Sequence, residues 1–279
     1  EIMPSLVGSE MCIRDRLFTP LSPDTISLTA GALYSPEEIL AAGKKGTYSA
    51  ACLSRSFPQG GYTFLRSADG EVTIGIDHAP LGFGSIAAHA HEDAMSFQLF
   101  DGDTPVLIDS GTYLYHTCAA ERDRMRAEPA HNTICLPHAP QGEMLGAFLW
   151  GRKGSMTLTE SSLRRPDGRQ TVEMEGFTFN GSPLRRRFVF DSVKKILEVT
   201  DFITTPYNEV TFIFAPGLEV THTGNRVIAG QWIIDAGERR LRTEPVSVAP
   251  RYGELATATA VRFSIPYGGK FTTRIYKDT

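Results

Sequence analysis

The 279-residue sequence lacks several features that would place it in a specialised class of protein. No apolar run approaches the roughly eighteen residues that a membrane-spanning helix needs. The net charge is −4, so the basic balance typical of nucleic-acid-binding domains is missing. Four irregularly spaced cysteines without a C-x-x-C pair argue against a disulfide framework or a cysteine-ligated zinc site. We therefore expect a globular protein with neither a membrane span nor nucleic acid as a partner.

Helical periodicity is also scarce, and it is confined to the first part of the chain. The stretch 35–38 combines an N-cap serine, a proline at the first helical position and a glutamate three residues after the cap, and Gly43 provides a stop. Residues 1–16 have no periodicity and resemble translated adapter sequence, so we exclude them from the fold as a non-native segment. We expect residues 17–56 to be the remnant of a helical domain, truncated upstream, followed by a linker.

From residue 57 onward the sequence changes to short β-type runs separated by Gly, Asp, Asn and Pro. Residues 62–66 and 72–77 flank a turn at 68–70, and a second hairpin is predicted to turn at 101–104. Roughly fifteen such runs follow one another at a spacing of about 8–12 residues. This pattern predicts an all-β domain over residues 57–279, built as an antiparallel β-sandwich.

Potential metal ligands gather between residues 87 and 133. Histidine and carboxylate side chains suit Zn²⁺, and two histidines separated by one residue raise the expectation of a metal site above that for a lone histidine. The candidates are His89, His91, Asp93, Asp109 and His131.

The expected hairpin geometry makes it difficult for His91 and Asp109 to bind the same metal ion. With a turn centred on residues 102–103, Asp109 falls opposite about Ser96 rather than His91. The 89–93 segment must therefore curl back, or the hairpin must be irregular. As an alternative, Asp109 caps the turn at Ser110-Gly111 and binds no metal.

Five other residues are candidates for substrate contact or proton transfer, each with a structural alternative. Arg122 and Arg126 can hold an anionic substrate through bidentate contacts, or they belong to a solvated loop or helical turn. Trp150 can stack on a sugar ring or fill the core. Tyr113 and Tyr115 alternate after Gly111, and one of them can act as an acid or base near the histidines, or both pack at a strand edge.

Several stretches in order resemble the C-terminal domain of the heparinase II/III-like polysaccharide lyases, a family that also includes alginate and oligoalginate lyases. The resemblance covers about residues 57–276, and members pair an N-terminal (α/α) toroid with a β-sandwich of this kind. It rests on F-P-x-G-G-Y at 57–62, P-L-G-F-G at 80–84, A-A-H-A-H-E-D-A-M-S-F at 87–97, V-L-I-D-S-G-T-Y at 106–113, A-H-N-T at 130–133 and F-L-W-G-R-K at 148–153.

The resemblance implies roles for single residues. His89 is similar to the histidine that the sandwich contributes to the active-site cleft. His91, Asp109 and His131 are similar to the zinc ligands, with the zinc organising the site. The chain departs from the common family pattern at Ala90 and Glu92 and lacks an aromatic residue near 124–125, so we assign no catalytic tyrosine from the resemblance.

The implied activity is β-elimination on an acidic polysaccharide or oligosaccharide that contains uronic acid, in the periplasm or outside the cell. In the family the toroid supplies further catalytic residues, so we expect this chain alone to bind Zn²⁺ and to turn over poorly or not at all. One alternative is a non-catalytic glycan-binding sandwich with a structural zinc site. A second is a metal-dependent hydrolase in which Asp93 or Glu92 serves as the base. The sequence leaves the oligomeric state open.

Overall fold

The computed structural model describes residues 54–82, 84–206, 208–265 and 267–278. These residues belong to one compact unit, Leu53–Thr279. The predicted helix after residue 35 lies outside the described residues, and the domain boundary at residue 57 stays a prediction. No helix in the described part of the chain is long and apolar enough to cross a membrane.

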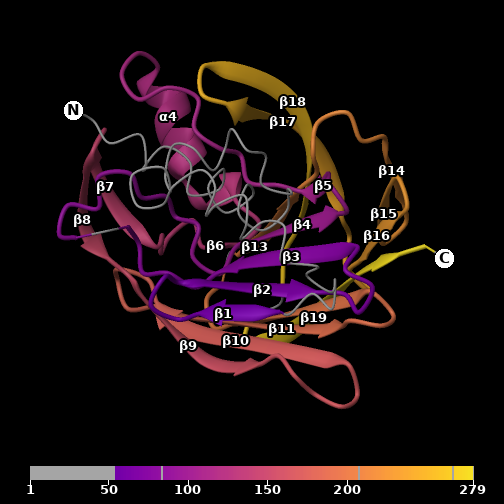
Figure 1. Ribbon diagram of the computed structural model, residues 1–279. Helices are drawn as coiled ribbons and strands as arrows, with labels where there is room; N and C mark the ends of the chain where they lie inside the picture. The colour runs from indigo at the N-terminus through magenta and orange to yellow at the C-terminus, as the bar shows by residue number, and fades with distance from the viewer. Residues whose placement is uncertain (1–53, 83, 207, 266, 279) are drawn as a thin grey trace, which may run out of the picture. The chain divides into compact units, whose positions relative to one another are not determined.

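Antiparallel sheets make up most of the described structure (Figure 1). The first sheet has the order β1-β2-β3-β4-β5, with bounds Arg55–Phe57, Tyr62–Arg66, Val72–Asp77, Phe97–Asp101 and Thr104–Leu107. The largest has the order β14-β15-β16-β19-β12-β11-β10-β9, with bounds Val220–Thr223, Arg226–Ala229, Trp232–Asp235, Gly269–Lys277, Ile196–Ile203, Pro183–Asp191, Arg169–Phe177 and Ser155–Ser162. A third has the order β17-β18-β13-β6, with bounds Arg242–Arg251, Glu254–Phe263, Glu209–Ile213 and Ile134–Cys135. A separate hairpin pairs β7 (Gly142–Gly146) with β8 (Leu149–Lys153).

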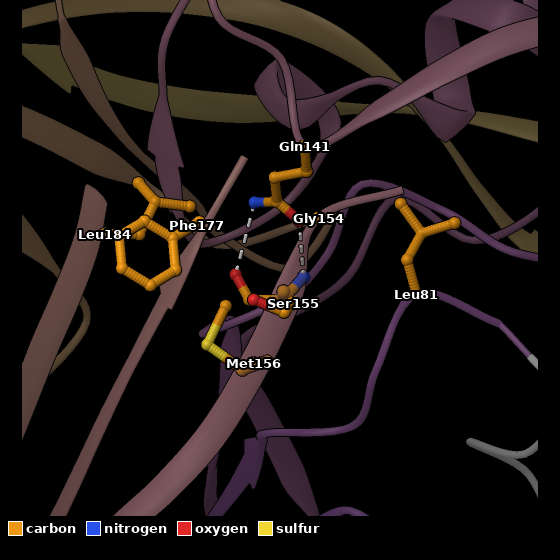
Figure 2. Close-up of a pocket in the computed structure, with 8 residues that line it drawn as sticks. Leu81, Gln141, Gly154, Ser155, Met156, Phe177 and Leu184 are labelled. Carbon is orange, nitrogen blue, oxygen red and sulfur yellow. Dashed lines mark hydrogen bonds between the residues drawn. The ribbon is translucent and has the colours of Figure 1, made fainter. Parts of the chain in front are cut away.

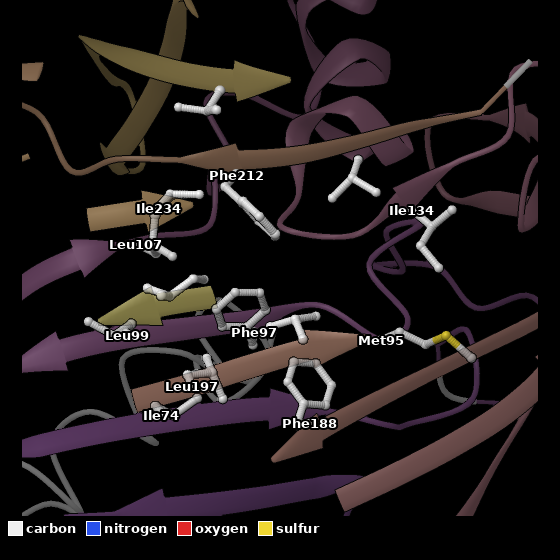
Figure 3. Packing of buried hydrophobic residues seen from close by; sticks show 14 of the residues in the cluster. Ile74, Met95, Phe97, Leu99, Leu107, Ile134, Phe188, Leu197, Phe212 and Ile234 are labelled. Atoms are coloured by element: carbon white, nitrogen blue, oxygen red, sulfur yellow. The ribbon is translucent and has the colours of Figure 1, made fainter. Parts of the chain in front are cut away.

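The strands form because apolar residues alternate along them and meet in one core between the sheets. On β12 every second residue is buried, as the two-residue period of a strand with one covered face requires. Figure 3 shows Phe97, Phe188 and Phe212 among the packed side chains. The ring of Phe97 lies edge-on to Phe188 at 5.4 Å and to Phe212 at 5.6 Å, so three sheets share this centre. The predicted antiparallel sandwich is confirmed.

Both predicted hairpins are present, and the second is irregular. β4 and β5 join through a tight turn in which Asp101 opposes Thr104, and the register shifts between Leu99 and Phe100. β4 begins only at Phe97, and residues 87–96 contain no strand. The structure therefore contains both of the features named as alternatives, a curled segment before β4 and an irregular hairpin.

The longest elements that the sequence pattern did not predict are α4 (Ala119–Arg126) and β17, although a helical turn was one alternative for the arginine run within α4. Helix α4 begins at Cys118 without a side-chain cap and carries few apolar residues, so the usual start signal and apolar stripe are absent. Strand β17 is largely exposed and contains Pro245, which hides its strand character because proline is normally confined to sheet edges.

Candidate functional site

Three segments far apart in the sequence bring His91, Asp109 and His131 together. His91 lies in the loop before β4, Asp109 follows the end of β5, and His131 ends the 3₁₀ helix η2 (Glu128–Ala130). Potential ligand atoms from the three residues all lie within 4.8 Å of one another. The Asp109 carboxylate contacts Nδ1 of His131, and the two imidazole rings lie 5.3 Å apart. The residues predicted to share a metal therefore form one cluster, in which His131 is buried and His91 and Asp109 are half-buried.

The loop that carries His91 folds back tightly on itself. Ala87 and Met95 have positive φ angles of 47° and 64°, a conformation that non-glycine residues rarely adopt. A Cβ atom on Gly82 would lie only 2.5 Å from the Cβ of Ala87. The Met95 N–H donates to the Asp77 carbonyl at 3.1 Å. Small residues and these turns allow the close backbone approach that places His91 inside the cluster.

Two buried glutamates hold the backbone around the cluster. Glu92 accepts hydrogen bonds from the N–H groups of Gly142 at 3.0 Å and Glu128 at 3.3 Å. Glu128 accepts from Leu136 at 2.7 Å and Gln141 at 3.1 Å. Burial raises the pKa of both carboxyls above its usual value, and for Glu128 the neighbouring Glu92 raises it further. Glu92 is therefore engaged with backbone donors and ties the His91 loop to the segments of Gly142 and Glu128.

Asn132 fixes the chain beside His131. Its amide donates to the carbonyls of Phe97 at 2.7 Å and Ile108 at 2.9 Å, and accepts from the Ile213 N–H at 2.7 Å. Because the side chain is buried, each of these hydrogen bonds replaces one that water cannot supply. Asn132 thus ties the segment of His131 to β4, to the residue before Asp109 and to β13.

Arg186 reaches the same region from the largest sheet. It is 0 % exposed and forms a double contact with Asp201, which is also 0 % exposed. Its Nη1 donates to the carbonyls of Met95 at 2.9 Å and Asn132 at 2.8 Å. One buried ion pair therefore anchors two of the segments that carry the ligand candidates.

Gln141 supports the loop that carries His91, and the two meet at a small hollow lined by Ala94 and Gln141 (Figure 2). The hollow measures about 10 Å³ and is mainly apolar, with Leu81, Met156 and Phe177 among its walls, so it cannot hold a sugar. The Gln141 side chain accepts from the Ala94 N–H at 3.0 Å and donates to the Ala94 carbonyl at 3.3 Å. We regard this hollow as part of the scaffold.

Burial and neighbouring charges set the protonation of the cluster. Burial, with the nearby charge of His131, lowers the pKa of His91 to about 3. Burial alone would raise the pKa of Asp109, but the charge and hydrogen bond of His131 lower it below its usual value. Burial raises the pKa of Asp93 to about 6, and burial together with Asp93 raises that of Asp77 well above its ordinary value. Neutral imidazole and ionised carboxylate are the forms that bind metals.

This donor set fits a divalent metal ion. Two imidazoles and one carboxylate are typical of zinc sites with a further open position. Asp109 also accepts from the Gly111 N–H at 2.8 Å, and Thr112 Oγ1 lies 3.4 Å from His91 Nε2, the kind of supporting contact that orients metal ligands. A dication would also favour the ionised forms of the buried carboxyls nearby.

His89 lies outside the cluster, exposed and surrounded by aromatic rings. It meets the ring of Tyr115 at 5.3 Å and that of Phe148 at 5.6 Å, both at steep angles. Tyr115 also lies 5.5 Å from Tyr252, which is 49 % exposed. Burial raises the pKa of Tyr115, whose side chain is hydrogen-bonded to Thr112. Sequence patterns assigned no role to Phe148 or Tyr252, because only tertiary structure brings the β7–β8 connection to His89 and the β17–β18 connection to Tyr115.

The three residues predicted to contact substrate are Arg122, Arg126 and Trp150, and each has little exposed surface. Trp150 is 2 % exposed, and the guanidinium of Arg126 stacks on its ring at 4.6 Å. Arg126 also donates to the carbonyls of Gly146 and Ala147. The Arg122 side chain, 10 % exposed, contacts Asp123 and donates to the Tyr115 carbonyl at 3.1 Å. As packed, Arg126 and Trp150 present no free face to a sugar and instead support the β7–β8 hairpin.

The family follows from the sequence match. Residues 52–276 match the model of the heparinase II/III-like C-terminal domain, so the chain belongs to this family, as the resemblance predicted. Solved structures that resemble it are named heparan sulfate lyase and heparinase III. A comparison with curated proteins gives no match.

Solved structures share the fold. The crystal structure of heparan sulfate lyase HepC from Pedobacter heparinus matches with a TM-score of 0.70 and 17 % identity, covering 92 % of this chain and 41 % of that one. A heparinase III gene product matches with a TM-score of 0.69 and 16 % identity, covering 92 % and 41 %. Another heparinase III crystal structure gives 0.60 and 14 %, covering 81 % and 37 %. The chain thus spans about two fifths of the length of these proteins.

Proposed function

We propose that this chain is the metal-bearing sandwich of a polysaccharide lyase that cleaves acidic polysaccharides containing uronic acid. The observation that carries the proposal is the cluster of His91, Asp109 and His131, largely enclosed and close to the exposed His89, within a domain of the heparinase II/III-like family. Relatives in structure named heparan sulfate lyase and heparinase support the substrate class. Export to the periplasm or the medium follows from the proposal, because such a substrate is extracellular.

His91, Asp109 and His131 are proposed to hold Zn²⁺. When bound, the ion supplies a fixed positive charge that keeps the three ligand segments together. The protein around it positions the cleft residues. Thr112 links the two parts of the site, because it lies beside His91 and is hydrogen-bonded to Tyr115.

His89 and Tyr115 are the residues proposed to move protons. In β-elimination a base removes the proton at C5 of the uronate, the C4–oxygen bond breaks, and an acid returns a proton to the leaving glycosidic oxygen, so no water is consumed. A neutral histidine can accept the first proton. Because burial raises the pKa of Tyr115, its phenol stays protonated at neutral pH and can donate the second. Arg122 holds the Tyr115 backbone in place, and its contact with substrate stays a prediction.

An elimination assay tests this proposal. The complete protein that contains this chain is incubated with uronate polymers, and the ultraviolet absorbance of the unsaturated product is followed. We expect His89→Ala and Tyr115→Phe to reduce kcat by about 100-fold or more, the scale of general acid–base catalysis. Tyr113→Phe is the matched control in the same loop and should keep its activity. Absence of product from every uronate polymer contradicts the proposal.

Two other functions give different outcomes in the same experiment. A glycan-binding sandwich with a structural zinc binds oligosaccharide without forming product, and the partly exposed rings of Tyr115, Phe148 and Tyr252 could serve such binding. A metal-dependent hydrolase yields saturated products. Of the two bases that the hydrolase alternative names, Glu92 is buried and engaged with backbone N–H groups, which leaves Asp93 as the candidate.

A further inference from the structure

An open groove lies between two strand edges outside the cluster of His91, Asp109 and His131. It measures about 520 Å³ and is formed by the start of β1, the end of β9 and the residues that follow β9. β1 and β9 are end strands of their sheets among the described strands, and Figure 1 shows them near each other, away from α4. The lining residues are Ser54, Arg55, Ser56, Ser161, Ser162, Leu163 and Arg164.

Buried hydrogen bonds fix the floor of this groove. The Ser54 hydroxyl donates to the Gln170 side chain at 2.7 Å and accepts from the Arg66 N–H at 2.8 Å. Gln170 in turn donates to the Arg66 carbonyl at 3.0 Å. Because Ser54 and Gln170 are both buried, these contacts join the edge of the first sheet to β10, and β10 is paired with β9. The two walls of the groove therefore keep a fixed separation.

Among the described residues, the lining of the groove carries positive charge and no acidic side chain. Arg55 and Arg164 are both exposed, and within the described residues neither guanidinium has a carboxylate partner. The nearby acids are engaged elsewhere. Asp167 pairs with Arg165 at 3.4 Å, and Glu160, the acidic residue of β9, faces Arg187 at 3.8 Å.

We propose that this groove binds the carboxylate or sulfate groups of an acidic sugar chain, as a second binding site outside the candidate cleft. Two guanidiniums offer the planar paired donors that suit such anions, and the hydroxyls of Ser161 and Ser162, which also line the groove, can bond sugar hydroxyls. The choice of a sugar chain rests on the proposed function. The positive charge and the hydroxyl lining rest on this chain's own residues.

Edge protection is the competing explanation. Charged side chains on end strands prevent sheets from pairing with another chain, and Arg55 and Arg164 could serve only that purpose. The two explanations differ in what the loss of the arginines does. A binding site loses affinity for anionic sugar, whereas a protected edge loses solubility or begins to associate.

Binding to the 279-residue chain decides between them. The probes are a heparin-derived oligosaccharide of defined length, a neutral oligosaccharide of similar length and inorganic sulfate, measured by calorimetry at low and high salt. Arg55→Ser with Arg164→Ser should weaken heparin-oligosaccharide binding by about tenfold at low salt, the size expected for two exposed charge contacts. The loss should shrink at high salt, and the neutral probe should not respond. Sulfate alone should bind weakly and lose that binding in the double variant.

Arg240→Ser with Lys270→Ser is the matched control, because both residues are exposed and the pair removes the same charge. Equal weakening by both double variants, no weakening by the groove variant, or association of the groove variant without loss of affinity each overturns the proposal. The double variant His89→Ala with Tyr115→Phe, measured in the elimination assay described above, tests the proposed function separately from binding in the groove. If elimination is absent while the groove variant still loses affinity, the proposed function fails and the groove stands.

Discussion

The largest sheet and the loops that carry the candidate metal ligands are stabilised in different ways. In β10, β11 and β12 consecutive residues pair in register, and along β11 and β12 every second side chain is buried. Residues 87–96 form no strand and contain two positive φ angles. Buried polar side chains such as Gln141 and Arg186 hold their backbone through hydrogen bonds. The sheet repeats one pattern many times, so single exposed positions matter little. The loops depend on a few buried side chains, each with several partners.

That difference suggests where a lyase-family domain is fragile. Arg186, Asn132, Glu92 and Glu128 each hold two or more backbone groups near the ligand candidates. A buried polar group that loses its partner costs more than an exposed one. We therefore expect substitution of one of these residues to lower both the free energy of unfolding and the affinity for metal. Loss of a surface ion pair should lower stability slightly and leave the metal site intact.

Removal of the buried arginine should have the largest effect. Arg186→Met leaves the Asp201 carboxylate without its partner at a site that is 0 % exposed, which typically costs about 3–5 kcal/mol. Arg226→Met breaks the exposed Arg226–Asp235 pair and should cost less than about 1 kcal/mol. Urea unfolding of both variants measures the difference. Equal losses would contradict the contrast between the two regions.

A smaller effect should appear at Asp93 and depend on pH. Burial raises its pKa to about 6, so the folded chain holds a proton that the unfolded chain has released. Stability contributed by this proton is present below the unfolded value near 4 and is lost as pH rises through about 6. Metal-free Asp93→Asn should therefore be more stable than the wild type at pH 7.5 by about 1–3 kcal/mol.

Thermal unfolding across pH tests this expectation. The advantage of Asp93→Asn should decline as the pH falls from 7.5 to 4. Asp103→Asn, at an exposed turn position, should show no such trend. A constant difference between Asp93→Asn and the wild type over the whole range would show that the Asp93 carboxyl is not buried as described.

Two glycines with the same backbone conformation should give the smallest contrast. Gly111 and Gly102 have φ angles of 72° and 57°, so alanine is strained at both by about 1–2 kcal/mol. At Gly111 the added Cβ would also lie 2.3 Å from the Ala249 carbonyl oxygen, whereas at Gly102 it meets open space. Gly111→Ala should therefore lose more stability than Gly102→Ala in parallel thermal melts. The reverse order would contradict the close packing of the loop after Asp109.

Much of the fold could be predicted from the sequence because it depends on local patterns. Apolar runs and the turn residues between them located β2, β3, β11 and β12, and in β11 and β12 burial repeats every second residue. Helix α4 and strand β17 could not be found, because one lacks a cap and an apolar stripe and the other lacks a buried face along most of its length. Their conformations depend on contacts with distant segments.

The candidate site divides in the same way. His91, Asp109 and His131 stood out because their residue types suit a metal and because ordered motifs resemble the family. The burial of Arg126 and Trp150 and the aromatic surroundings of His89 could not be inferred, because Phe148 approaches His89, and Tyr252 approaches Tyr115, only in the folded chain. The chemistry of single residues was visible in the sequence, whereas their exposure was not.

Metal analysis of the purified chain tests the central claim most directly. We expect about one zinc per wild-type chain, and near-complete loss in His91→Ala and Asp109→Ala. His222→Ala removes an exposed histidine on β14 and should leave the zinc content unchanged. Zinc retained in the His91 and Asp109 variants, or absent from a wild-type chain purified with zinc, would contradict the assignment of His91, Asp109 and His131 as the metal site.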